Sequence, residues 1–153
     1  MSNENVPGAE GKRRIDALFA RYGESHRHPT NEAIHWVCVP LITWSMLAVL
    51  WAWTPVAACA LIALALAFYL TLSVPIALGM LGIATLMVAP FTQVASGPLA
   101  VGALVVFVIA WIGQFVGHRI EGRKPSFFED LKFLLVGPAW LLGFVYRRFG
   151  IGY

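Results

Sequence analysis

Histidine side chains gather in two short stretches of this chain, and their spacing would allow them to surround one metal ion. His26, His28 and His35 lie within ten residues, and the fourth histidine, His118, comes much later in the sequence. Imidazoles suit first-row metals such as Fe, Zn, Cu and Ni, and two histidines with one carboxylate form the site of non-haem Fe(II) oxygenases. The histidines are therefore candidate metal ligands.

Amide and carboxylate side chains recur at helical spacing beside two of these histidines. Asn31 precedes His35 by four positions, and Gln114 precedes His118 by four. Glu121 follows His118 by three positions. Residues three or four apart share one face of a helix, and polar groups next to a metal-bound imidazole orient it and fix its tautomer. We expect Gln114 to face the interior of a helix bundle, because a buried amide in lipid is costly.

Simpler interpretations of single histidines stay open, because an imidazole at a membrane interface can be solvated through its polar edge. His28, between Arg27 and Pro29, is the histidine that we most expect to face water. The sequence contains no Ser-His-Asp set, P-loop or dinucleotide-binding motif, and it has too few histidines for a membrane di-iron desaturase. The pattern as a whole favours one metal or catalytic site.

The composition is that of an all-α integral membrane protein. The chain has 153 residues, of which 59% are hydrophobic and 12% are charged, whereas soluble domains have about 25% charged residues. We predict a disordered tail over residues 1–11 and a single membrane-embedded domain over residues 12–153. The net charge of +3 comes from basic clusters beside the apolar segments, which is a signal of membrane topology rather than of nucleic-acid binding.

Proline and glycine divide the long apolar region into four predicted membrane spans. No Asp, Glu, Lys or Arg occurs between Trp36 and Gly117, and a helix needs about 20 residues to cross the hydrocarbon layer. The predicted spans cover residues 34–53, 56–74, 76–92 and 98–118. Gly113 and Gly117 form a small-xxx-small pair that would let the last span approach a neighbour closely.

The basic residues predict an even number of crossings. Arginine and lysine residues stand before the first span and after the fourth, and none stands in the connections. Because positively charged loops favour the cytoplasm, we predict a four-helix transmembrane bundle with both termini cytoplasmic. Antiparallel neighbours would then bring His35 and His118 to the same membrane face, together with His26 and His28.

Two flanking segments are predicted to lie along or partly within the membrane. Residues 12–24 form a short amphipathic helix, expected at the membrane surface, with apolar positions at Ile15, Leu18, Phe19 and Tyr22. Pro29 ends this segment, and Thr30 or Asn31 is expected to be the N-cap of the first span. Residues 131–147 have a short apolar part, which favours a re-entrant or interfacial helical hairpin broken at Gly137-Pro138. A fifth crossing stays the alternative for this segment.

The two polar stretches resemble a known family. HRHPTNEAIHWVCVPL and, much later, WIGQFVGHRIEGRKPSFFEDL are similar to the 2-hydroxy-fatty-acid dioxygenase family of small membrane proteins, and the resemblance extends from about Arg14 to Arg148. It implies an Fe(II)-dependent dioxygenase that uses O₂ to cleave a 2-hydroxy fatty acid into CO₂ and the acid one carbon shorter. The short His-x-x-Glu spacing at His118 is similar to bacterial relatives, which implies the bacterial inner membrane.

Carried over by position, the resemblance implies that His26, His35 and His118 bind Fe(II), with Glu121 as a further ligand or as a partner of a ligand. Positively charged side chains could pair with the substrate carboxylate, and the candidates are Arg27, Arg119 and Arg123. Two other functions remain alternatives. One is a zinc-dependent hydrolase acting on membrane lipids, and the other is a small membrane protein without enzymatic activity.

Overall fold

The described part of the chain is helical throughout. The computed structural model describes residues 13–24, 26–122 and 133–153, and no β-strand occurs in these ranges. The helices are α1 (Arg14–Gly23), α2 (Pro29–Trp53), α3 (Pro55–Leu70), α4 (Val74–Val88), the 3-10 helix η1 (Ala89–Gln93), α5 (Ser96–Ile120) and α7 (Val136–Arg148). The predicted all-α class is confirmed for these residues.

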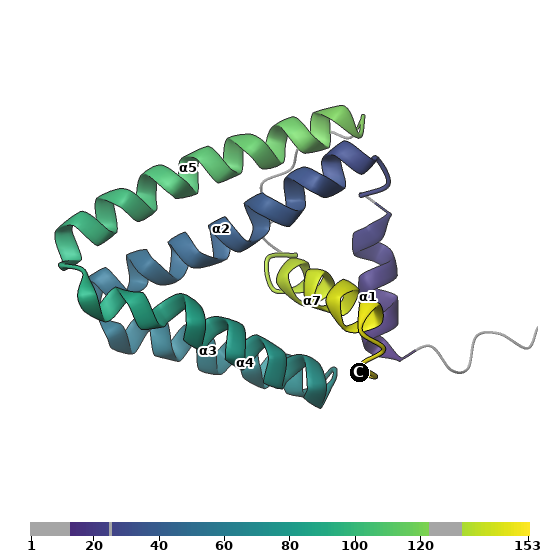
Figure 1. The fold of residues 1–153 in the computed structure, drawn as a ribbon, viewed down its shortest axis with the longest axis horizontal. Coiled ribbons are helices and arrows are strands. Elements are labelled where there is room, and N and C mark those ends of the chain that lie inside the picture. The colour runs from purple at the N-terminus through teal and green to yellow at the C-terminus, as the bar shows by residue number, and fades with distance from the viewer. Residues whose placement is uncertain (1–12, 25, 123–132) are drawn as a thin grey trace, which may run out of the picture.

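The helices form two arms that meet at one end and separate at the other (Figure 1). Helices α2 and α5 lie side by side in opposite directions and form the first arm, and α3 and α4 form the second arm. We call the end where the arms meet the closed end and the opposite end the open end. Helices α1 and α7 lie at the open end, where the first turn of α2 lies beside the last turn of α5 (Figure 1).

Helices occupy all four positions at which membrane spans were predicted. Among the described residues, three helical stretches are long and apolar enough to cross a membrane, namely Pro29–Trp53, Val74–Gln93 and Ser96–Ile120. Helix α3 has 16 residues and is therefore about 24 Å long, which is shorter than the roughly 30 Å hydrocarbon layer. The positions of the four helices are confirmed, and a crossing by each of them remains a prediction.

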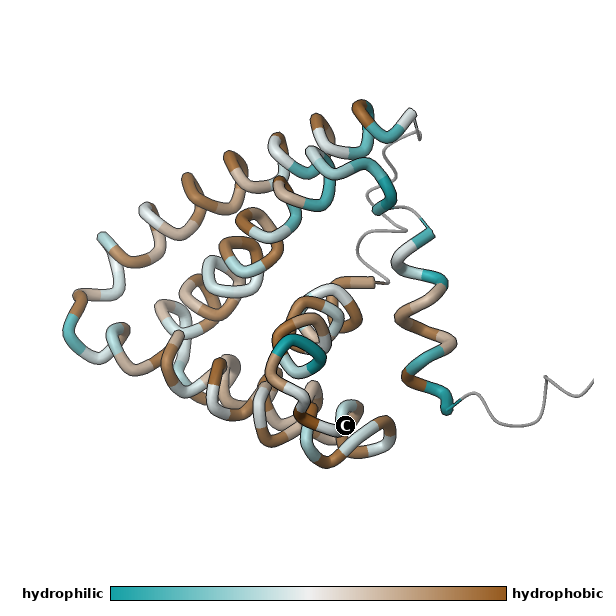
Figure 2. The backbone as a smooth tube through the Cα atoms, turned by 45° about the vertical axis from the view of Figure 1, so that its right-hand side comes forward, coloured by the Kyte–Doolittle hydropathy of each residue, from teal (hydrophilic) through white to brown (hydrophobic). Residues whose placement is uncertain are grey.

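The outer faces of the long helices are apolar. Large aliphatic side chains more than half exposed occur on every long helix, among them Val37, Leu64, Leu86, Val101 and Ile109. Hydrophilic residues gather at the open end, in α1 and in the adjoining ends of α2 and α5 (Figure 2). Extended apolar surface of this kind is unusual for a soluble monomer and suits contact with lipid.

Helix α2 begins earlier than predicted. Its N-cap is His28, whose Nδ1 accepts a hydrogen bond of 3.2 Å from the Thr30 N–H, and Pro29 occupies the first helical position. The expectation of Thr30 or Asn31 as the N-cap is therefore wrong. Proline suits the first position because its φ angle is preset and its missing N–H would be unbonded there anyway. The earlier start places Asn31 within the first turn of the helix, four positions before His35.

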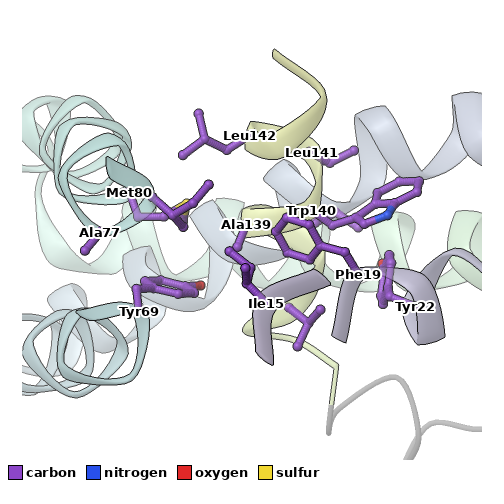
Figure 3. Packing of buried hydrophobic residues seen from close by; sticks show 13 residues of the cluster. Ile15, Phe19, Tyr22, Tyr69, Ala77, Met80, Ala139, Trp140, Leu141 and Leu142 are labelled. Carbon is purple, nitrogen blue, oxygen red and sulfur yellow. The ribbon is translucent and has the colours of Figure 1, made fainter. Parts of the chain in front are cut away.

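The apolar face of α1 packs against α7, and the expected position of this helix along the membrane surface stays a prediction. Ile15, Phe19 and Tyr22 are buried in a cluster with Trp140 and other α7 residues (Figure 3). A Cβ atom added to Gly143 of α7 would lie 2.7 Å from the Phe19 ring, so the two helices are in close contact. The amphipathic pattern was correct, and its partner is protein.

The described part of the predicted hairpin over residues 131–147 is a turn over residues 133–135 followed by one helix, α7. Gly137 and Pro138 lie in the first turn of α7 and do not divide it, which is a position that proline tolerates; residues 131 and 132 lie outside the described residues. Two hydrogen bonds fasten this region to the second arm: Tyr69 donates to the carbonyl of Leu135 at 2.7 Å, and Tyr146 donates to the carbonyl of Pro75 at 2.8 Å. Helix α7 thus lies between the arms.

Candidate metal centre

Three histidines from distant parts of the chain meet at the open end. His26 lies just before α2, His35 is in its second turn and His118 is in the last turn of α5. One possible ligand atom from each ring lies within 4.8 Å of the others. All three side chains are buried, with exposed fractions of 7%, 1% and 6% respectively. The predicted convergence of these residues is therefore present in the structure.

The backbone sets the orientation of two of these rings. Nδ1 of His26 lies 2.7 Å from the carbonyl oxygen of Tyr22, and Nδ1 of His35 lies 2.9 Å from the carbonyl oxygen of Asn31. A carbonyl only accepts hydrogen bonds, so we assign the proton of each neutral ring to Nδ1. Nε2 is then the nitrogen that each ring offers to a metal, as in many protein metal sites.

Glycine allows α5 to approach α2 closely at the height of the cluster. A Cβ atom added to Gly117 would overlap the side-chain oxygen of Asn31 and lie 3.4 Å from the His35 ring. One turn earlier, a Cβ atom on Gly113 would lie 2.6 Å from the sulfur of Cys38. The predicted small-xxx-small contact is confirmed, and it lies directly beside two of the candidate site residues.

The carboxylate of Glu121 joins the end of α5 to the start of α2. Its oxygens accept hydrogen bonds from the backbone N–H groups of Arg27 at 3.1 Å and His28 at 2.8 Å, and from the Asn31 side chain at 3.0 Å. Partial desolvation opposes ionisation, but the hydrogen bonds from His28, Asn31 and Arg27, together with the nearby His26, lower the pKa of Glu121 below its ordinary value of 4.5. Glu121 therefore supports Asn31 and the segment that carries His26.

Aromatic side chains enclose the His26 ring. Tyr22 stacks on it with ring centroids 4.2 Å apart and an interplanar angle of 15°. The Trp140 ring of α7 is 5.7 Å away. Neither residue was predicted from the sequence to belong to the site. The helical spacing of Tyr22 and His26 was a usable signal, whereas nothing local in the sequence connects Trp140 with His26.

A small cavity of about 20 Å³ lies against His35, which is enough room for a molecule the size of water. Gln114 and Tyr22 contribute polar side chains to its wall, and most of the rest is apolar, including Val39, Ile42 and Leu134. Gln114 is buried, with 6% of its surface exposed. It therefore faces the interior, as its amide predicted.

The remaining candidates lie around the cluster rather than in it. His28 is exposed and caps α2, so the structure does not bring it to the other three histidines. Arg27 and Arg119 are exposed next to His26 and His118 in sequence, which places them at the open end. Arg123 lies outside the described residues.

Comparison with known proteins identifies the family of this chain. A family described as 2-hydroxy-palmitic acid dioxygenase Mpo1-like matches residues 13–149, a range that contains the three clustered histidines and all the described helices. No curated protein and no solved structure gave a match. The chain belongs to the Mpo1-like family.

Proposed function

We propose that this protein is an Fe(II)-dependent dioxygenase that cleaves 2-hydroxy fatty acids, releasing CO₂ and the fatty acid one carbon shorter. The observation that carries the proposal is the buried cluster of His26, His35 and His118. The name of the family, 2-hydroxy-palmitic acid dioxygenase Mpo1-like, supports the substrate class. The proposal places the active site at the cytoplasmic face of a bacterial inner membrane.

The residues of the cluster fit a divalent iron ion. His26 and His35 each direct a proton at Nδ1 to a backbone carbonyl, so each retains one nitrogen lone pair for a metal. Three imidazoles are a donor set that suits first-row metals. When bound, Fe(II) supplies positions for O₂ and for the 2-hydroxy carboxylate, and it supplies the one-electron chemistry that O₂ needs. In this proposal Glu121 orients the ligands through Asn31 and the backbone before α2.

The proposed reaction is balanced without an external reductant. A 2-hydroxy acid, R–CH(OH)–COOH, and O₂ give R–COOH, CO₂ and H₂O. The bond between C1 and C2 breaks, and the four electrons that reduce O₂ come from the substrate itself. The protein therefore needs to bind the acid and O₂ together and to exclude competing water.

The side chains around the cluster suit these tasks. The mostly apolar wall beside His35 limits the entry of water, and Gln114 supplies a polar group there. Holding two reactants in one orientation lowers the entropic part of the barrier. Arg27 and Arg119, exposed at the open end, are proposed to pair with the substrate carboxylate, together with Arg123.

The test combines metal content with product analysis. The detergent-purified protein should contain about one iron per chain and, with O₂ present, should convert 2-hydroxypalmitate into pentadecanoate and CO₂. His35→Ala and His118→Ala should lose both the iron and the turnover. Absence of pentadecanoate from protein loaded anaerobically with Fe(II) and then exposed to O₂ would refute the proposal.

A zinc hydrolase is the second candidate, because three histidine ligands with an open position are also a catalytic zinc site. Elemental analysis that finds zinc, together with lipid hydrolysis that continues without O₂, would favour this candidate over the dioxygenase.

A further inference from the structure

A second cavity lies deeper in the molecule, between the two arms. It measures about 50 Å³ and is lined by residues of α2, α3, α4 and the start of α7. Its wall includes Met46 and Leu47 of α2, Leu66 of α3, and Met80 and Ala84 of α4. On α2, the residues that line this cavity lie nearer to the closed end than those that line the cavity at His35.

The two hydroxyl side chains in the wall of this cavity already donate their hydrogen bonds to backbone carbonyls. Thr43 donates to the carbonyl of Val39 at 3.0 Å, and Tyr69 donates to the carbonyl of Leu135 at 2.7 Å. The other side chains of the wall are aliphatic, methionine or proline. A cavity of this composition suits an alkyl chain, because burial of a polar group there would cost free energy.

The deep cavity continues the cavity at the histidines. Leu134 lines both. Along α2, His35, Val39 and Ile42 line the first cavity, and Thr43, Met46 and Leu47 line the second. The distance along the helix from His35 to Leu47 is about 18 Å. One layer of acyl chains occupies half of the hydrocarbon core, or about 15 Å, so the two lengths match.

We propose that the deep cavity holds the acyl chain of the substrate, and that the chain passes Leu134 on its way from the histidine cluster. This inference rests on the proposed function and adds the site that selects substrates by the length of their acyl chain. At about 50 Å³ the cavity is smaller than a whole chain. Entry therefore requires rotamer changes of the lining Leu and Met side chains, and methionine adapts readily to such changes.

Ala84 determines the accepted chain length in this arrangement. It lies one turn beyond Met80 on α4, toward the closed end, and both line the cavity. Ala84→Phe would fill the far part, which a short chain does not reach. Ala63 of α3 is exposed, so Ala63→Phe is a matched control that adds the same side chain outside the cavity.

Two measurements test the proposal. Ala84→Phe should lower kcat/KM for 2-hydroxypalmitate about tenfold or more, since even one methylene group in an apolar pocket changes selectivity by about 10-fold or more. Its effect on kcat/KM for 2-hydroxyoctanoate should be much smaller, and Ala63→Phe should leave kcat/KM for both substrates at the wild-type value. If the ratio of kcat/KM for 2-hydroxypalmitate to kcat/KM for 2-hydroxyoctanoate in Ala84→Phe equals that of the wild type, the inference is overturned. The dioxygenase proposal would remain intact in that case.

The second measurement does not depend on turnover or on the variant. Wild-type protein is illuminated with 2-hydroxypalmitate that carries a diazirine in its chain, and the labelled residues are identified by mass spectrometry. Label at Leu66, Met80 or Ala84 that excess 2-hydroxypalmitate removes would support the cavity, even if no dioxygenase activity were found. Label confined to outward-facing residues such as Val101 and Ile109 would overturn the inference.

Discussion

Gly117 and Asn31 are in direct contact across the α2–α5 interface, because a methyl group on Gly117 would overlap the side-chain oxygen of Asn31. The same methyl group would lie 3.4 Å from the His35 ring. The residue that brings the two helices together therefore also sets the space available to the histidine cluster.

Gly117→Ala should destabilise the protein by about 1–3 kcal/mol, the usual cost of adding a methyl group to a packed interior. Its metal content should fall because Asn31 and His35 must move. Thermal unfolding in detergent and elemental analysis measure the two effects. Gly102→Ala is the matched control, since a Cβ atom there meets nothing within 4 Å. Equal unfolding temperatures for the two variants would contradict the close contact.

His35→Ala should remove the bound metal, whereas His28→Ala should retain it. His35 is buried in the cluster, and His28 is an exposed N-cap. Loss of the cap should cost about 1 kcal/mol of stability without reaching the site. Metal per chain, measured on both purified variants, is the test. Comparable metal loss from both would show that the cluster of three is not the binding site.

Glu121→Gln should still bind the metal but hold it less tightly. The reason is that Glu121 supports the histidine cluster indirectly, through Asn31 and the backbone of Arg27 and His28. Dissociation of iron into a chelator, followed over time, should be faster than in the wild type. Complete absence of iron, as expected for His35→Ala, would instead identify Glu121 as a direct ligand.

The stability difference between the wild type and Glu121→Gln should depend on pH. The folded-state pKa of Glu121 is lowered below its ordinary value of 4.5. Its carboxylate therefore contributes stability that is present above that value and is lost as the pH falls through the folded pKa. Unfolding temperatures measured from pH 7 to pH 3 should show a constant difference down to about pH 5 and a shrinking one below it. A difference that grows in acid would have the wrong sign.

Tyr69→Phe should lower stability by about 1 kcal/mol or somewhat more, because it leaves the Leu135 carbonyl without its hydroxyl donor. Tyr69 is only 2% exposed, and its hydroxyl bonds Leu135 at 2.7 Å. Denaturant unfolding gives the free-energy change. Unchanged stability would show that this hydrogen bond contributes nothing. Leu135 also lines the deep cavity, so the variant should in addition accept a broader range of chain lengths.

The main helices and the convergence of the histidines were predictable from the sequence. The absence of charges from Trp36 to Gly117, together with the prolines, located four helices to within a few residues. An even number of antiparallel helices places His35 and His118 at the same end of the bundle, and the packing of α2 against α5 then brings them together. Gly113 and Gly117 predicted that the last span approaches a neighbour closely, and the structure shows that this neighbour is α2.

The position of α7 was not predictable, because it depends on tertiary contacts alone. The apolar residues of α1 and α7 are equally compatible with lipid and with protein as a partner, since both environments remove them from water. Only the folded structure shows that Trp140 lies beside His26 and that Leu134 borders both cavities. The N-cap role of His28 was missed because Thr30 and Asn31 are more usual caps.

The place of α7 has a consequence for biogenesis. The ribosome makes residues 134–140 after every other described helix, yet Leu134, Gly137 and Trp140 form part of the wall around His35 and His26. A nascent chain that ends after α5 contains all three histidines but still lacks that wall. If the protein binds a metal ion as proposed, we expect stable loading to follow completion of the polypeptide.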